Sequence, residues 1–185
     1  TAQAQGGLSG QYLAGVHALQ RNDPVAAAEY FAEVARRDPG NGFVLEQALL
    51  NQVLARDVTG AARSAERLVY LAAEHRLANL VLVARDLRRG GYAAGLKRLQ
   101  ERQDSFHPLI GGLLTVWAAE GASQPETADA ALAALGEDGL DGVMRGYHGA
   151  LLALLRGQPE TAAQELARVR TELGARTIFN ILGPL

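Results

Sequence analysis

Apolar residues recur along this chain at intervals of three and four, with polar residues between them. In one stretch Ala27, Phe31 and Val34 fall on a single stripe, a spacing that predicts an amphipathic helix. Asp23-Pro24 precedes the stripe, and Asp is a good helix cap while Pro fits the first helical position. Pro39-Gly40 follows and cannot continue the helix. The pattern therefore predicts one helix with a defined start and end.

Similar stretches follow one another along the chain, separated by short turns rich in Gly, Pro, Asn and Asp. The predicted helices cover about residues 9–21, 24–38, 43–55, from 57 onward, 77–89, 92–102, 108–120, 125–135, 142–156 and 159–174. Because the connections are only a few residues long, neighbouring helices must pack antiparallel. The pattern predicts an all-α protein built from five helix pairs.

The pairs repeat with a fixed period. Gln124–Ala128 recurs letter for letter as Gln158–Ala162. The same spacing separates Asp23 from Asp57, and Asp57 from Gly91. A period of about 34 residues is typical of helix–turn–helix repeats that stack into a solenoid.

The stretch 8–41 carries most of the features of one known repeat type. Ala14-Gly15 is a small pair in its first helix and Asn22-Asp23 is its turn. Ala27 and Phe31 then lie in the second helix, and Pro39 closes the unit. With weaker copies of these features further along, residues 8–176 resemble the tetratricopeptide repeat (TPR) family. The resemblance implies a right-handed α-solenoid of antiparallel helix pairs.

The period and the resemblance together define the expected organisation. We expect a flexible leader over residues 1–7, one repeat domain over 8–176, and an apolar segment over 177–185 that is a cap or the stump of a further repeat. The expected repeats are 8–41, 42–75, 76–108, 109–142 and 143–176. The second repeat has Ala73 in place of the closing Pro, and the register slips by about one residue around 103–112.

Composition favours helices and excludes several classes of function. The chain is 48% hydrophobic but only 5% aromatic, and small residues of high helix propensity let helices pack closely. A net charge of −2 disfavours a nucleic-acid binder, which needs a basic face. The absence of Cys removes disulfides and thiolate chemistry. The longest apolar segment, about 109–119, is shorter than the roughly 18–20 residues of a membrane span.

The sequence holds no recognisable catalytic constellation. It has no phosphate-binding loop, no zinc-binding His-Glu-x-x-His and no Gly-x-Ser-x-Gly elbow. The Gly-rich stretch 90–95 has no strand before it and fits a repeat turn. The four histidines are far apart, and none has a second ligand at helical spacing. We therefore expect no enzyme activity, no cofactor and no metal.

Gln52 and Asp86 are polar at positions of the first helix where this repeat type packs an apolar side chain. One interpretation is that they reach solvent or a neighbour's backbone. The other is that they hydrogen-bond a ligand in the groove, since an unpaired buried carboxylate is costly.

In the TPR family the first helix of each pair lines a concave surface that binds peptides or proteins. Carried over by position, the resemblance assigns that surface to Tyr12, Val16, Gln20, Glu46, Leu50, Leu54, Leu80, Arg88, Trp117, Tyr147 and Leu151. Trp117, the chain's one Trp, is the leading candidate anchor. The alternative for the whole set is ordinary packing between repeats.

The predicted function is a non-catalytic scaffold that holds a protein or peptide in this concave groove. One alternative is the helical accessory region of a larger cell-envelope enzyme. Another is a structural module that self-associates into a homo-oligomer through the apolar end Ile178–Leu185. The small polar leader Thr1–Gly7 favours an exported or periplasmic protein over a cytoplasmic one, and a cloning boundary would look the same.

Overall fold

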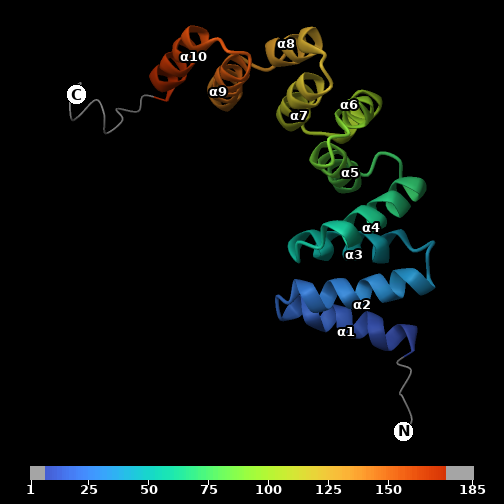
Figure 1. Cartoon of the computed structure of the whole chain (residues 1–185). Coiled ribbons are helices and arrows are strands. Elements are labelled where there is room, and N and C mark those ends of the chain that lie inside the picture. Colours follow the sequence, from blue (N-terminus) through green and yellow to red (C-terminus); the bar gives the residue numbers. More distant parts are fainter. Residues whose placement is uncertain (1–6, 174–185) are drawn as a thin grey trace. The chain divides into compact units, whose positions relative to one another are not determined.

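A computed structural model of the chain describes residues 7–173 (Figure 1), and all its regular structure in that range is helical. The helices are α1 (Leu8–Gln20), α2 (Pro24–Arg37), α3 (Gly42–Leu54), α4 (Val58–Leu71), α5 (Arg76–Arg88), α6 (Tyr92–Glu101), α7 (Pro108–Gly121), α8 (Pro125–Ala133), α9 (Gly139–Leu155) and α10 (Pro159–Glu172), with a short 3-10 turn at Gln103–Ser105. The prediction of an all-α fold built from consecutive helix pairs is confirmed.

Side chains at the predicted turns start several of these helices. The carboxylate of Asp23 accepts a hydrogen bond from the amide of Ala26 (3.0 Å), and Asp57 accepts one from Gly60 (2.9 Å). These bonds satisfy backbone donors that a helix start otherwise leaves free. Pro occupies the first position of α2, α7, α8 and α10, where it costs no hydrogen bond.

The turns within the pairs share one backbone conformation, although their residues differ. The first helix of every pair is followed by a residue with positive φ; these are Asn22, Arg56, Gly90, Ser123 and Gly157. The next amide in each case donates to the carbonyl five residues earlier, as from Asp57 to Gln52 (2.8 Å). This closure is the Schellman motif, which satisfies carbonyls at a helix end. Successive turns keep the period of the sequence except from Gly90 to Ser123, where the interval is one residue shorter, so the register slip lies there.

The chain forms two compact units, Thr1–Phe106 and His107–Leu185. Helices α1 to α6 belong to the first unit, and α7 to α10 belong to the second. The sequence pattern did not predict a boundary there, although the register slip falls in the same part of the chain. The expected repeat boundaries remain a prediction, and the segment 177–185 lies outside the described residues.

The core of the first unit joins α1 to α5. Its buried residues are Ala18, Ala27, Phe31, Val34, Ala35, Val44, Leu45, Ala48, Leu49, Ala61, Ala65, Leu68, Ala78 and Leu82. A β-carbon added to Gly15 would lie 3.0 Å from the Phe31 ring. The predicted small residue at Gly15 therefore sets the distance at which α1 packs on α2.

The second unit holds smaller clusters. Leu109 and Leu113 of α7 pack with Leu135, and Ala150 and Ala153 of α9 pack with Ala162 of α10. A β-carbon on Gly146 would lie 2.6 Å from a methyl group of Val169, so α9 and α10 also approach closely. Helix α9 begins at Gly139, three residues before the predicted start at Gly142. Gly139 has a φ of +59°, which lets the chain turn into the helix there.

None of the helices within residues 7–173 combines the length and the hydropathy that crossing a bilayer requires.

The recurring turn yields a stability test. Arg56 adopts a backbone conformation that costs a non-glycine residue about 1 kcal/mol, and its side chain is exposed. We expect Arg56→Gly to raise the free energy of unfolding of the first unit by about 0.5–1 kcal/mol in urea denaturation. Gly90→Ala, at the equivalent turn, should lower it by about 1 kcal/mol. An equal decrease in the free energy of unfolding in both variants would contradict the assigned turn geometry.

Candidate partner-binding faces

The candidate groove residues all lie on the first helices of the pairs. Those in the first unit are Tyr12, Val16 and Gln20 on α1, Glu46, Leu50 and Leu54 on α3, and Leu80 and Arg88 on α5. Those in the second unit are Trp117 on α7 and Tyr147 and Leu151 on α9. Gln20, Glu46, Leu50, Leu54, Arg88 and Tyr147 are exposed, and the other members are partly buried. Each unit thus carries its own set, and their assignment to one binding surface remains a prediction.

Helix α3 is apolar on two sides. Leu45 and Leu49 on one side are fully buried in the core. Leu50 and Leu54 on another side are exposed, Leu54 at 59%, and the neighbouring Val53 is exposed as well. A surface helix normally has one apolar stripe and a polar remainder, so the second stripe on α3 is unusual and makes it a candidate contact surface.

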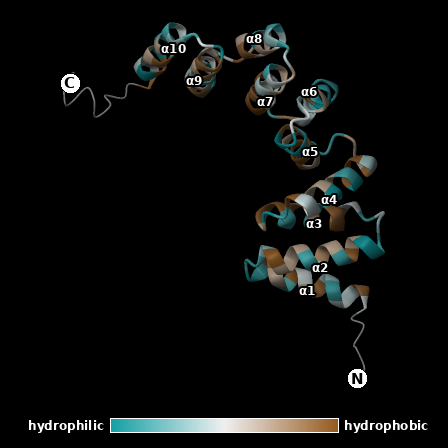
Figure 2. Cartoon of the chain, viewed as in Figure 1, coloured by the Kyte–Doolittle hydropathy of each residue, from teal (hydrophilic) through white to brown (hydrophobic). Residues whose placement is uncertain are grey.

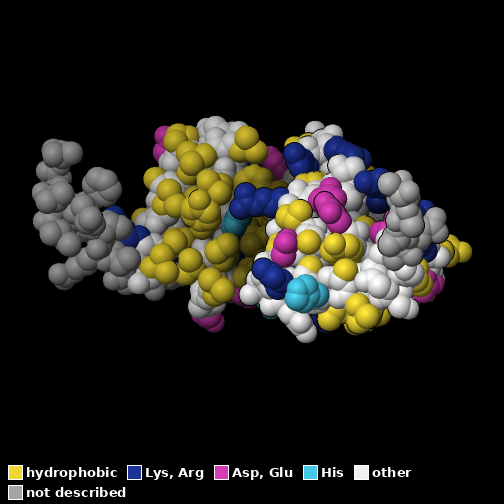
Figure 3. Space-filling view, turned by 90° about the horizontal axis from the view of Figure 1, so that it is seen from below, with side chains coloured by type: hydrophobic (Ala, Val, Ile, Leu, Met, Phe, Trp, Pro, Cys, Tyr) yellow, Lys and Arg dark blue, Asp and Glu magenta, His cyan; other side chains and the backbone are white. Residues whose placement is uncertain are grey.

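Helix α9 also carries exposed apolar side chains. Leu140, Tyr147 and Leu154 are exposed, and they follow one another at helical spacing with the partly buried Leu151. Hydrophobic colour covers much of α9 in Figure 2. Figure 3 shows hydrophobic side chains gathered over the second unit. Sequence reasoning selected Tyr147 and Leu151 but missed Leu140, two turns before Tyr147, and Leu154, one turn after Leu151.

Trp117 is held within the second unit. Its indole nitrogen donates a hydrogen bond to Nδ1 of His148 (2.9 Å), and the two rings meet edge to face with centroids 5.9 Å apart. The ring of Tyr147 also meets that of His148 edge to face, with centroids 5.5 Å apart. Burial lowers the pKa of His148, which matches its role as a neutral acceptor. The polar end of Trp117 is therefore occupied, and Tyr147 is the exposed aromatic of the cluster.

Tyr12 and Val16 also serve internal packing. Both pack against the core of the first unit, and the Tyr12 ring meets Phe31 edge to face with centroids 5.9 Å apart. For these two residues the structure shows the contacts expected from the packing alternative.

Gln52 and Asp86 find partners inside the protein. With its amide nitrogen facing α4, Gln52 donates to Ser64 Oγ (2.7 Å) and to the carbonyl of Gly60 (3.2 Å). The carboxylate of Asp86 pairs with Arg85 (2.7 Å) and lies 3.8 Å from Nε of Arg98. Gln52 reaches the backbone of the next helix, as the first interpretation expected. Asp86 instead meets arginine side chains, one on its own helix and one on α6.

Arg88 lies in a basic part of the first unit. It lines a cavity of about 300 Å³ with Arg85, Arg89 and the first residues of α4. Arg85 is engaged by Glu66 and Asp86. Neither Arg88 nor Arg89 forms a hydrogen bond or ion pair through its side chain within residues 7–173. An acidic group of a partner could bind there.

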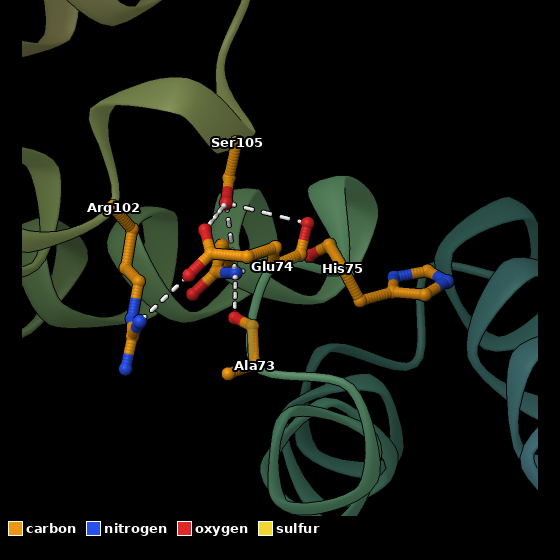
Figure 4. Close-up of polar contacts among 6 residues, drawn as sticks. Ala73, Glu74, His75, Arg102 and Ser105 are labelled. Carbon is orange, nitrogen blue, oxygen red and sulfur yellow. Dashed lines mark hydrogen bonds and ion pairs between the residues drawn. The ribbon is translucent and has the colours of Figure 1, made fainter.

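A polar cluster braces the end of the first unit (Figure 4). Glu74 accepts hydrogen bonds from Ser105 Oγ (2.8 Å) and Arg102 (2.7 Å), and these bonds hold the pKa of its carboxyl below the usual range. The buried amide of Asn79 donates to the carbonyl of Ala73 (2.8 Å). His75 points away from this cluster, and its Nε2 lies 3.5 Å from Glu46. The cluster joins the connection between α4 and α5, where the second repeat lacks the closing Pro, to the 3-10 turn after α6.

In the described part of the chain, no three or more His, Asp or Glu side chains are grouped so that they could hold a metal ion. The exposed side chains described above provide apolar and charged surface for contact with another molecule.

The partly buried His148 generates a pH test. The pKa of His148 is lower in the folded chain than in the unfolded chain. As the pH falls from the unfolded-state pKa to the folded-state pKa, the unfolded chain takes up a proton first, so the free energy of unfolding decreases. The stabilisation is therefore fully present only above the usual pKa of a histidine. We expect the thermal midpoint of the second unit to fall more between pH 7.5 and 5.5 in the wild type than in His148→Asn. The fluorescence of Trp117 should titrate over the same range, because protonation of Nδ1 removes its hydrogen bond. An identical pH response in both proteins would contradict this assignment.

Comparisons with known proteins support the fold. No family model and no curated protein matches the sequence. Among solved structures, the chain is similar to "MamA 41-end from Desulfovibrio magneticus RS-1", with a TM-score of 0.71 and 17% identity over 92% of this chain and 97% of that one. It is also similar to a crystal structure of MamA protein, with a TM-score of 0.70 and 13% identity over 89% of this chain and 91% of that one. At these identities the likeness shows the fold alone, a TPR-like helical solenoid.

Proposed function

We propose that this chain is a non-catalytic scaffold that binds a protein or peptide on the exposed apolar faces of its first helices. The observation that carries the proposal is the second apolar stripe on helices that already bury one stripe in the core. Leu50 and Leu54 form it on α3, and Tyr147 and Leu154 form it on α9. Exposed apolar surface of this kind costs solubility, so a contact that covers it is its simplest purpose.

The chemistry of the faces indicates the kind of partner. Leucine and tyrosine side chains at helical spacing suit an amphipathic helix or an extended apolar peptide. Arg88 and Arg89 add positive charge to the first unit, which favours a partner with acidic groups beside its apolar anchors. The fold supports the proposal by analogy only, since solenoids of this kind present extended binding surfaces without chemistry of their own.

The proposal predicts which exposed residues matter. Tyr147→Ala and Leu54→Ala should each weaken capture of a partner from a native lysate by at least about fivefold, since truncating an interface anchor costs about 1 kcal/mol or more. Quantitative mass spectrometry on the immobilised full chain measures this. Both residues are exposed, so circular dichroism should show unchanged helix content.

Matched controls lie on the second helices of the pairs. Tyr70 on α4 is 90% exposed and Leu71 is 45% exposed, so Tyr70→Ala and Leu71→Ala remove the same side chains from the other helix of a pair. These variants should capture the partner as the wild type does. Loss of capture in the controls with normal capture by Tyr147→Ala and Leu54→Ala would contradict the proposal.

A further inference from the structure

A cavity of about 430 Å³ lies between the second helices α2 and α4 of the first unit, and Gln52 of α3 also lines it. Its volume corresponds to roughly a dozen water-sized groups, which is room for a small organic molecule. Gln52 and Ser64 are only 5% and 7% exposed, so part of the wall is buried polar surface. The cavity includes none of the exposed apolar residues proposed above to bind a partner, and the inference drawn from it is independent of the scaffold function.

The buried wall of the cavity holds a hydrogen-bond donor without an acceptor. The amide of Gln52 donates to Ser64 Oγ (2.7 Å) and to the carbonyl of Gly60 (3.2 Å). The hydroxyl proton of Ser64 has no acceptor of its own within residues 7–173. Because a buried polar group without a partner is costly, a ligand atom that accepts a hydrogen bond is favoured beside Ser64.

Two arginines of α4 add further donors to the same cavity. Arg63 is exposed, and its side chain forms no hydrogen bond or ion pair in the described part of the chain. Arg67 reaches α2, where its Nη2 donates to the carbonyl of Ala35 (2.6 Å), and its side chain makes no other hydrogen bond between residues 7 and 173. A guanidinium has five N–H donors, and their geometry matches the oxygens of a carboxylate or a phosphate.

The acidic residues of the cavity leave these donors unsatisfied. Glu33 accepts hydrogen bonds from Arg36 (2.6 Å) and Arg37 (2.8 Å), so its charge is already paired. Glu29 is exposed and forms no ion pair with any described residue. Three arginines and two glutamates line the cavity, which leaves one positive charge in excess. The lining therefore favours a ligand with negative charge.

The next helix pair satisfies one of these positions with a carboxylate of the protein itself. Helices α5 and α6 follow α3 and α4 at one constant interval, so their residues correspond one to one. Asp86 takes the place of Gln52, and Arg98 takes the place of Ser64. The Asp86 carboxylate lies 3.8 Å from Nε of Arg98. In α5 and α6 the buried position thus carries an acceptor that α3 and α4 do not provide.

The two arginines of α4 show the same difference. Lys97 of α6 takes the place of Arg63, and Glu101 takes the place of Arg67. Nζ of Lys97 lies 3.8 Å from Oε1 of Glu101. Helices α3 and α4 therefore have an amide and an arginine at the two positions where α5 and α6 have carboxylates. An anionic ligand would supply acceptors to donors that α6 pairs internally.

We propose that the cavity between α2 and α4 binds a small molecule through a carboxylate or phosphate group, with the hydroxyl of Ser64 and the guanidinium groups of Arg63 and Arg67 as its donors. The ligand contacts both helices, so its binding stabilises the first unit.

Titration of the full chain with inorganic phosphate or with glutarate, each against sodium chloride at the same ionic strength, tests the proposal. We expect saturable shifts of the amide NMR signals of residues 60–67 with at least one of the two anions. A response to phosphate alone would support the proposal and assign the site to phosphorylated molecules, and a response to glutarate alone would support it and assign the site to organic acids. An equal response to chloride, or no saturable shift with either anion, would overturn it.

Variants test the assigned donors. Arg63→Gln should weaken anion binding about tenfold or more, since a hydrogen bond to a charged group is worth at least that factor. Arg67→Glu places a carboxylate at the position of Glu101 and should abolish saturable binding. Arg21→Gln removes an exposed arginine outside the cavity and should bind as the wild type does. Equal affinity of Arg63→Gln and the wild type, or an equal loss in Arg21→Gln, would overturn the proposal.

Discussion

The close approach of paired helices is the constraint on which this structure depends. Two helices joined by a tight turn can bury a stripe each only if small residues let their backbones come together. Gly15 against Phe31 does this in the first unit, and Gly146 against Val169 does it in the second. The left-handed residue that follows each first helix fixes the turn, and its recurrence keeps the pairs in step.

Once the pairs are fixed, some apolar residues of the first helices α3 and α9 have no place in the core. Leu54 on α3 and Tyr147 on α9 are left at the surface for this reason. Their exposure follows from geometry, and selection for binding would explain why they are leucine and tyrosine rather than charged residues. The proposed scaffold function thus uses side chains that stability does not require.

Much of the fold could be predicted because residues typical of turns and helix starts recur at a nearly constant interval along the sequence. Asp23 and Asp57 cap helix starts by hydrogen bonds to amides three residues later. Such local capping can be predicted from the sequence alone. Contacts between distant residues were out of reach: the bond from Trp117 to His148 joins residues 31 positions apart, and no spacing rule selects it. The division of the chain after Phe106 was also missed, because the segment there keeps the composition of its surroundings.

The central claim is that the first helices of the pairs, rather than the second, meet the partner. Its most direct test is a hydrogen-exchange footprint of the chain with and without a purified partner at saturation. We expect slower exchange in α3 or α9 and unchanged exchange in α2 and α4. Slower exchange confined to α2 and α4, with none in α3 or α9, would contradict it.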